Sequence, residues 1–184
     1  MQPGEVVFQG KIKTIDIVIR YPTMDDIASL QEFINAASAE HTFIRLQGET
    51  FSFEEEAQYV DDVLSKMKAK RMTKLLALQG EELLAVADIT LQPYSTKHLG
   101  TFGIIVKQSA RGMGIGKKLM SMLISTAKTA LPDLEIIVLS VYERNVAARK
   151  LYESMGFKEY GRLPNGRKLQ KGYDNEIQMY LPLK

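Results

Sequence analysis

The chain has 184 residues, of which 45% are hydrophobic and 25% are charged, as expected for one globular domain, which we place at residues 1–184. It has no cysteine and only two histidines, so disulfides and a cysteine nucleophile are excluded, and we expect no metal site. The net charge of +2 gives no indication of a nucleic-acid partner, and no apolar run reaches the roughly 20 residues of a membrane span. Because the N-terminal segment alternates apolar and polar residues and lacks a secretion signal, we expect a cytoplasmic protein.

The first half of the chain predicts a strand, two helices and a hairpin. Residues 15–20 alternate isoleucine with other residues, which is typical of a half-buried strand. Helix starts follow at Thr23 and at Ser52, each with an acidic residue three positions later. Residues 75–79 and 83–92 are apolar segments around a short turn, which favours a hairpin.

The second half alternates between apolar strands and helices. The predicted elements are strands at 98–106 and 135–141, helices at 112–130 and 146–155, and two final strands at 157–161 and 176–181. Asn145 is the candidate N-cap of the second of these helices, and Gly156 is the candidate residue that ends it. This order predicts a mixed sheet with helices on its faces, in place of a doubly wound fold of repeating units.

A glycine-rich turn joins the strand that ends at Val106 to the helix that follows. Its sequence is Arg111-Gly112-Met113-Gly114-Ile115-Gly116-Lys117. Glycines let the backbone approach an anion closely, and the first amides of a helix have no internal partners, so an anion site is expected here. A dinucleotide fold would need glycine where Lys117 stands, and a nucleotide P-loop would need serine or threonine at Lys118, so both nucleotide motifs fail. The alternative is that the glycines only form a tight turn.

A second group of residues follows the buried strand at 135–141. On the helix that begins after Asn145, Ala148 and Tyr152 are four positions apart and share a face. Leu151 and Met155 share the neighbouring face, which we expect to meet the core.

Together the two segments resemble the GNAT superfamily of acyl-CoA-dependent N-acyltransferases. The loop pattern of that family is Gln or Arg, two residues, Gly, one residue, and Gly or Ala, and it is met by Arg111, Gly114 and Gly116. The pattern of its later helix is met by Asn145, Ala148, Leu151, Tyr152, Gly156 and Phe157. The resemblance covers nearly the whole chain. It implies an α/β fold with a mixed, mostly antiparallel central sheet flanked by helices, and a splayed strand pair at the cofactor cleft.

The resemblance also implies that acetyl-CoA is the co-substrate and that the amine attacks it directly in a ternary complex. Pantetheine would pair with the backbone of Ile104, Ile105 and Val106, and the amide of Ile105 or Val106 would polarise the thioester carbonyl. The diphosphate would lie against the loop amides, and Asn145 and Ala148 would also contact the cofactor. The loop residues implied in this binding are Arg111, Gly112, Met113, Gly114, Ile115, Gly116 and Lys117.

The catalytic groups are a tyrosine that the resemblance implies and a base that the sequence leaves open. The resemblance implies that Tyr152 is the general acid for the departing thiolate, and the alternative is that it only packs against the cofactor. Many relatives have a glutamate as base at the position of Thr101, which cannot take that role. The remaining candidates for the base are a bound water molecule and three side chains, namely Glu143, Asp88 and His98.

The acceptor is expected to be a primary amine, either a protein N-terminus, a polyamine or another small amine. A basic stretch in residues 161–174 could favour an acidic acceptor, although an ordinary solvated turn has the same composition; its basic residues are Arg162, Arg167, Lys168 and Lys171. We expect no nucleic-acid or membrane partner, and the sequence leaves a homodimer open. A function of a different class, a non-catalytic acyl-CoA-binding sensor with the same fold, is also compatible with the missing glutamate at Thr101.

Overall fold

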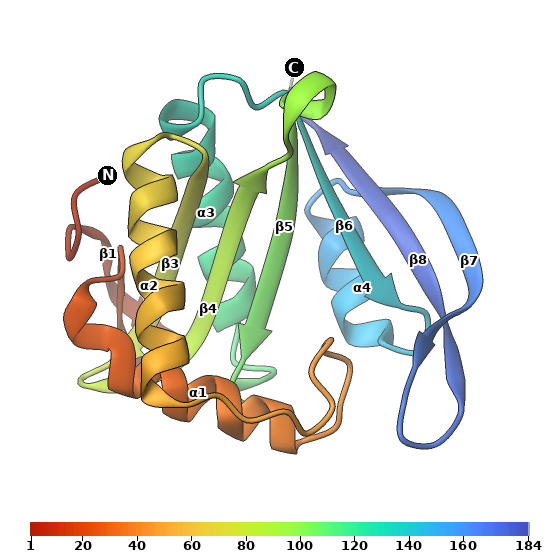
Figure 1. Ribbon diagram of the computed structural model, residues 1–184, viewed down its shortest axis with the longest axis horizontal. Coiled ribbons are helices and arrows are strands. Elements are labelled where there is room, and N and C mark those ends of the chain that lie inside the picture. Colours follow the sequence, from red (N-terminus) through yellow and green to blue (C-terminus); the bar gives the residue numbers. More distant parts are fainter. Residues whose placement is uncertain (184) are drawn as a thin grey trace.

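An eight-stranded sheet runs through the computed structural model, which describes residues 1–183, and helices cover both of its faces (Figure 1). The strand order is β1-β2-β3-β4-β5-β6-β8-β7, and every neighbouring pair is antiparallel except β5 with β6. The strands are β1 (Val6–Ile12), β2 (Ile15–Arg20), β3 (Met72–Gln79), β4 (Glu82–Leu91), β5 (Leu99–Val106), β6 (Ile136–Tyr142), β7 (Lys158–Lys168) and β8 (Tyr173–Pro182). The helices are α1 (Ile27–Ala39), α2 (Phe53–Lys68), α3 (Ile115–Ala130) and α4 (Val146–Ser154).

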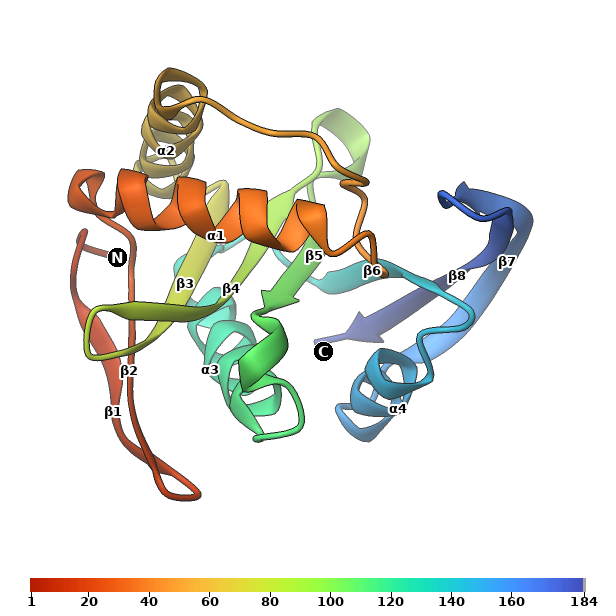
Figure 2. The same cartoon turned by 90° about the horizontal axis from the view of Figure 1, so that it is seen from below.

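Helices α1 and α2 lie on one face of the sheet, and α3 and α4 lie on the other (Figure 2). Strand β3 is buried on both faces: Leu75 belongs to the hydrophobic cluster that contains Leu119 and Leu123 of α3, and Leu76 belongs to the cluster that contains Leu30 of α1. This double burial explains why the strand is a nearly continuous apolar run in the sequence. None of the helices within residues 1–183 combines the length and the apolar character needed to cross a bilayer.

Both predicted helix starts in the first half are confirmed. Ser52 is the N-cap of α2: its hydroxyl accepts a hydrogen bond from the Glu55 amide at 3.2 Å, and the Glu55 carboxylate accepts one from the Ser52 amide at 2.8 Å. Ahead of α1, the Asp26 carboxylate accepts hydrogen bonds from the Thr23 amide at 2.7 Å and from the Thr23 hydroxyl at 3.1 Å. Asp26 also binds the guanidinium of Arg20 at 2.6 Å, which fixes the end of β2 against the start of α1.

Several elements differ from the sequence predictions, and β3 and β8 each begin three residues earlier than predicted. Three further differences have a local cause. Strand β1 was not predicted, because its exposed and half-buried residues show no clear alternation. Helix α3 begins at Ile115 and not at position 112, because Gly112 and Gly114 have φ values of 74° and 92°, outside the helical region. Strand β7 continues beyond position 161 to Lys168, through two register shifts that disturb the alternation of its side chains.

Strands β5 and β6 separate from each other partway along their length. They pair in parallel only from Leu99 with Ile136 to Thr101 with Val138. Beyond Thr101, β5 remains paired with β4, and β6 remains paired with β8, so the sheet opens into a V (Figure 1). The predicted fold class, a mostly antiparallel mixed sheet flanked by helices with a splayed strand pair, is confirmed.

Candidate active site

A cavity of about 930 Å³ occupies the opening between β5 and β6. Its walls come from seven places: the loop at 42–46, Asp88 and Thr90 of β4, residues 101–106 of β5, the glycine-rich turn, β6, α4 with the preceding Asn145, and Arg167 of β7. The cavity therefore brings together the two segments that the sequence singled out, which are some thirty positions apart along the chain.

The backbone of β5 presents hydrogen-bonding groups to this cavity. The Lys107 amide donates to Leu84 of β4 at 2.8 Å, which sets the alternation of the antiparallel pair. By that alternation, Ile105 pairs toward β4, whereas Ile104 and Val106 direct their amides and carbonyls into the opening. Of the two amides proposed to polarise a thioester, the structure turns that of Val106 toward the cleft.

The glycine-rich turn forms a helix N-terminus that is open to the cavity. Gly114 is the N-cap of α3, with left-handed backbone angles and no side chain to bind the first amides. The first intrahelical bond runs from the Lys118 amide to the Gly114 carbonyl at 3.1 Å, so the amides before it have no partner within the helix. A Cβ added to Gly116 would come within 3.3 Å of Val106, so glycine lets the helix lie close to β5. The arrangement suits a diphosphate group.

The side chains of the turn have several different roles. Arg111 lines the cavity but is held there by its bonds to the Glu40 carboxylate at 2.6 Å and to the Val106 carbonyl at 3.0 Å. Lys117 also lines the cavity, whereas the Lys118 ammonium lies over the Phe8 ring, 3.9 Å from its centroid.

Met113 and Ile115 of the turn direct their side chains into the hydrophobic core, and Ile115 is fully buried. Only their backbones can serve the proposed anion site. One residue near the turn was not singled out from the sequence: Lys13, in the turn between β1 and β2, donates to the Gly112 carbonyl at 3.1 Å. No signal in the sequence connects these two positions, which are 99 residues apart.

The helix after β6 begins and ends as predicted. The Asn145 side chain caps α4 by accepting a hydrogen bond from the Ala148 amide at 3.1 Å, and both residues line the cavity. Gly156 follows the helix with φ of 92°, a conformation that favours glycine. This cap fixes the rotation of α4, so that Tyr152 also lines the cavity.

Tyr152 is the aromatic side chain of α4 at the junction of cavity and core. It is 7% exposed, and its ring centroid lies 6.0 Å from those of both Phe102 and Phe157. Burial raises the pKa of Tyr152 to about 12. The hydroxyl therefore remains protonated over the whole working pH range and can act as a hydrogen-bond donor.

Of the three candidate base side chains, Asp88 is the one among the residues that line the cavity. Glu143 is engaged with the Arg162 guanidinium at 2.7 Å and with the Asn175 amide at 2.6 Å. His98 immediately precedes β5, at the end of the strand away from the glycine-rich turn. Thr101 lines the cavity and accepts a hydrogen bond from the Gln92 side chain at 3.3 Å.

A buried lysine lies beside Asp88, and sequence reasoning did not identify it. Lys74 pairs with Asp88 across β3 and β4, is 4% exposed, and donates to the Tyr59 hydroxyl at 2.9 Å. Burial acts to lower the pKa of Lys74, but Tyr59, Asp88 and Glu56 outweigh it, so the pKa is raised and the ammonium stays charged. Burial raises the pKa of Asp88, and the Lys74 charge limits that rise. Asp88 thus lies at the cavity wall, and its basicity is set by burial, which raises the pKa, and by Lys74, the Thr90 hydroxyl and Lys66, which lower it.

The end of the cavity away from the glycine-rich turn is lined by Tyr142 and Arg167. The Tyr142 hydroxyl donates to the Ile44 carbonyl at 2.7 Å, which holds the 42–46 loop over β6. The Arg167 guanidinium lies 5.3 Å from the Tyr142 ring centroid and binds Glu176 at 3.1 Å. This end is formed by segments that are distant in the sequence.

This chain is similar to known acetyltransferases in both sequence and structure. The sequence profile of the acetyltransferase (GNAT) family matches residues 34–157. An acetyltransferase of that family from Streptococcus pneumoniae has a structure with a TM-score of 0.83 and 25% identity, covering 91% of this chain and 99% of that one. YncA from Salmonella typhimurium, a putative acetyltransferase solved with its cofactor acetyl-CoA, gives a TM-score of 0.80 at 19% identity, with 91% and 94% of the two chains covered.

Protein SPT10 of Saccharomyces cerevisiae is 30% identical over 118 residues, which are 63% of this chain and 18% of that protein. The chain thus matches less than a fifth of the length of this curated relative. The family profile, by contrast, spans both the glycine-rich turn and the Tyr152 helix, and these are the two segments that enclose the cavity between the splayed strands. The chain therefore belongs to the acetyltransferase (GNAT) family.

Proposed function

We propose that this protein is an acetyl-CoA-dependent N-acetyltransferase. The observation that carries the proposal is the single cavity in which the open N-terminus of α3, the free edge of β5, Tyr152 and Asp88 meet. The solved structures similar to this one include YncA with acetyl-CoA and RimL, a ribosomal L7/L12 α-N-protein acetyltransferase, with coenzyme A. A ribosomal-protein-alanine N-acetyltransferase from Brucella melitensis is similar as well, at 22% identity and a TM-score of 0.79.

The cofactor would lie along the opened edge of β5. Its diphosphate would accept hydrogen bonds from the amides at the start of α3, and Lys117 would add a positive charge beside them. Pantetheine would pair with the backbone of Ile104 and Val106, which β6 leaves free. The Val106 carbonyl is occupied by Arg111 in this structure, so Arg111 would release it as the cofactor binds.

In the proposed reaction, the acceptor amine attacks the carbonyl carbon of the acetyl thioester and forms a C–N bond. The Val106 amide stabilises the negative charge that develops on the carbonyl oxygen. Asp88 takes the proton that the amine nitrogen loses, and the C–S bond breaks to release the coenzyme A thiolate. The acetyl group ends on nitrogen, and no covalent intermediate with the protein forms.

Tyr152 acts on the sulfur in this scheme. A thiol has an ordinary pKa of about 8.5, so the thiolate is a weaker base than a phenolate. Because burial raises the pKa of Tyr152 to about 12, complete transfer of its proton to sulfur is unfavourable. We therefore propose that the general-acid role takes the form of a hydrogen bond from the Tyr152 hydroxyl to the departing sulfur, and that the thiolate collects its proton from solvent after release.

The test of the proposed function is turnover. The purified protein is mixed with acetyl-CoA and with amines of several classes, thiol release is followed with time, and the products are identified by mass. Acetylated amine in proportion to released thiol supports the proposal. Tight binding of acetyl-CoA by calorimetry, with no turnover of any amine, would instead favour the non-catalytic sensor.

The cofactor loop can be tested with an isosteric pair of variants. Asn and Asp both tolerate the left-handed backbone at position 114, so Gly114→Asn reports the effect of a side chain and Gly114→Asp adds a negative charge to it. We expect Gly114→Asp to bind acetyl-CoA at least roughly tenfold more weakly than Gly114→Asn, about 1.4 kcal/mol, because it adds a negative charge to the helix N-terminus at which the diphosphate would bind. Calorimetry on both folded variants measures the difference. Equal affinities would mean that the diphosphate binds elsewhere.

The role of Lys74 can be tested through the pH dependence of the rate. Its ammonium lowers the pKa of Asp88, so Lys74→Met should raise that pKa and move the acidic limb of the kcat profile to higher pH. Tyr59→Phe removes the hydrogen bond to Lys74 but keeps the positive charge of Lys74. The acidic limb of its kcat profile should therefore stay closer to that of the wild type. Circular dichroism checks that both variants fold. If the acidic limb of the kcat profile lies at the same pH in Lys74→Met and in the wild type, the ionisation of Asp88 does not control the rate.

A further inference from the structure

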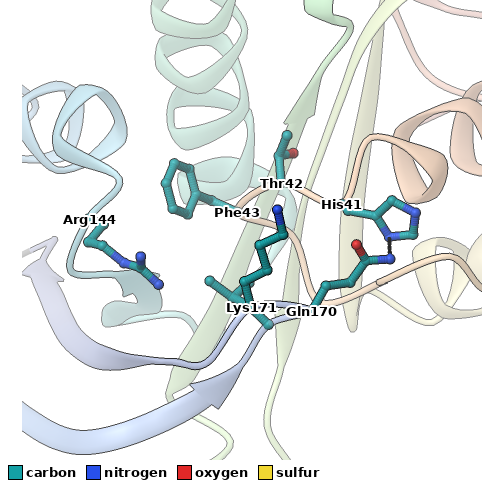
Figure 3. Close-up of a pocket in the computed structure, with 7 residues that line it drawn as sticks. His41, Thr42, Phe43, Arg144, Gln170 and Lys171 are labelled. Carbon is teal, nitrogen blue, oxygen red and sulfur yellow. Dashed lines mark hydrogen bonds between the residues drawn. The ribbon is translucent and has the colours of Figure 1, made fainter.

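Basic side chains gather at the end of the cavity that Tyr142 and Arg167 line, and in a second cavity beside it. Arg45 and Arg167 line the main cavity, and Arg144 and Lys171 line a smaller adjacent cavity of about 340 Å³. The two cavities share Thr42 and Phe43, and Figure 3 shows these neighbouring side chains above Lys171. At this end, four basic side chains therefore line the two adjoining cavities.

Arg167 is held rigidly in the wall of the main cavity. Its Nη2 binds the Ser140 hydroxyl at 2.5 Å and the Glu176 carboxylate at 3.1 Å, and its guanidinium lies against the Tyr142 ring. Both of these hydrogen bonds use one nitrogen, whereas a guanidinium has five N–H donors. The Nε of Arg167 is buried and has no hydrogen-bond partner within residues 1–183. The side chain is thus oriented in advance and keeps donor capacity for a ligand.

The other cations at this end are not fully neutralised. Arg144 is paired with the buried Asp174 at 3.4 Å, but the ion pairs formed by the described residues leave Arg45 and Lys171 without an acidic partner. Arg45 is exposed, and its charge, like that of Arg167, offsets part of the rise in the pKa of Tyr142 that burial causes. The charges of both guanidiniums therefore act on the same part of the cavity, around Tyr142.

The smaller cavity is a mouth between the 41–43 loop and the turn that joins β7 to β8. The Gln170 amide and the His41 ring are hydrogen-bonded at 3.0 Å, and this contact connects the two segments. In Figure 3 the Lys171 ammonium lies between Phe43 and His41, and Arg144 lies on the opposite side. The mouth is therefore lined by cations, aromatic surface and amides, with no carboxylate among its lining residues.

Across the two cavities, basic side chains lie near the Tyr142 end and the one lining carboxylate lies on β4. Asp88 is the one carboxylate among the residues that line either cavity, and it lies on the central strand β4. Near this end a cationic polyamine would meet Arg45 and Lys171, which no acidic residue of the described chain neutralises, beside the two ion-paired arginines, and repulsion of like charges would slow its entry. An amine that also carries a negative group would be attracted at the mouth, and its amino group could reach Asp88 while its negative group stayed with the arginines.

We propose that the acceptor of this enzyme is an amine that also carries a carboxylate, and that Arg167, assisted by Arg45, binds this carboxylate. The proposal rests on the proposed acetyltransferase function and narrows its acceptor class. The carboxylate can belong to a free amino acid or to an acidic residue near the N-terminus of a peptide. In either case it uses the guanidinium donors that Ser140 and Glu176 leave free.

The experiment compares matched pairs of acceptors that differ only in charge. One pair is an α-amino acid and its carboxamide, and the other is an amidated tripeptide with Glu or with Gln as its second residue. We expect the acidic member of at least one pair to have a kcat/KM higher by roughly tenfold to a hundredfold, the size of one charge-assisted hydrogen bond. The pair that shows this preference identifies the source of the carboxylate. Most of the difference should be in KM, since the contact is made in the ground state and the transition state alike.

Three variants connect the preference to its cause. Arg167→Gln should reduce kcat/KM for the acidic acceptor far more than for its neutral partner, and Arg45→Gln should do so to a smaller degree. Arg162→Gln is the matched control: Arg162 is also on β7, but it pairs with Glu143 and Glu159, outside both cavities, and its change should preserve the preference.

The outcomes separate this inference from the proposed function. Acetylation of neutral and acidic members at equal rates would overturn the inference and leave the acetyltransferase function standing. Equal loss for both members in Arg167→Gln would show that Arg167 only supports the fold of the β7–β8 hairpin, and it would also overturn the inference. Absence of any acetylated amine would overturn both.

Discussion

Asp88→Asn is expected to lower kcat/KM for acetyl transfer by roughly 10³-fold, within the range of about 10²–10⁴ that general base catalysis contributes. The carboxylate lines the cavity, and burial raises its pKa, which makes it a stronger base than a solvated aspartate. Asn has nearly the same shape but cannot accept a proton. The measurement is steady-state kinetics on the best amine from the panel, with acetyl-CoA affinity measured separately by calorimetry and expected to remain close to that of the wild type.

Two controls make this result specific. Glu143→Gln tests the other carboxylate, which is engaged with Arg162 and Asn175, and its rate should stay within about threefold of the wild type, since a surface change of this kind has a small effect. Thermal unfolding of Asp88→Asn shows whether the loss of a charge beside the buried Lys74 destabilises the fold. A folded Asp88→Asn variant with a nearly normal rate would assign proton removal to water, or to an amine that arrives neutral.

The parts of the structure that the sequence could predict are those determined by neighbouring residues. The start of α2 depends on Ser52 and Glu55 binding each other's amides, and the start of α4 depends on Asn145 capping Ala148. Glycine at 114 indicates the left-handed turn ahead of α3 in the same way. These contacts involve residues three positions apart or fewer, so a local pattern contains all of the information that they require.

The charged parts of the site depend on strand register, which local patterns do not determine. The hairpin turn pairs Gln79 with Glu82, and an unbroken ladder from that turn would place Lys74 opposite Ala87. A register shift between Ala77 and Leu78 moves the pairing by one residue, so that Lys74 lies opposite Asp88. A shift of one residue exchanges the two faces of a strand, and it decides whether these two charges meet at all.

The same reasoning applies to the acceptor end of the cavity. Leu163 pairs with Glu176, but a register shift follows, and Arg167 then pairs with Asp174. The composition of residues 161–174 showed that basic side chains were present, although it could not show which of them enters the cavity. Arg167 lines it, whereas Arg162 forms ion pairs outside it. The distinction comes from two irregularities in one strand, together with the position of Tyr142 on β6.

Tyr152→Phe is expected to lower kcat by roughly 10²-fold while acetyl-CoA affinity changes little. The change removes one hydroxyl and leaves the ring between Phe102 and Phe157, so the packing of α4 against the core should persist. The hydroxyl carries no negative charge at working pH, because burial raises its pKa to about 12. It can therefore donate to sulfur as the C–S bond breaks, and a contact that forms mainly in the transition state affects kcat more than binding.

The pH dependence and the leaving group separate this role from packing. Since the hydroxyl keeps its proton up to about pH 12, the wild-type rate should show no basic limb from Tyr152 between pH 6 and pH 10. An activated thioester, whose thiol leaves more easily, should lose less rate in Tyr152→Phe than acetyl-CoA does, because its departing sulfur requires less stabilisation. A kcat within about twofold of the wild type on both thioesters would mean that Tyr152 only packs against the cofactor. A collapse of affinity at unchanged kcat would assign the hydroxyl to cofactor binding, and the stabilisation of the thiolate would then have to come from water in the cleft.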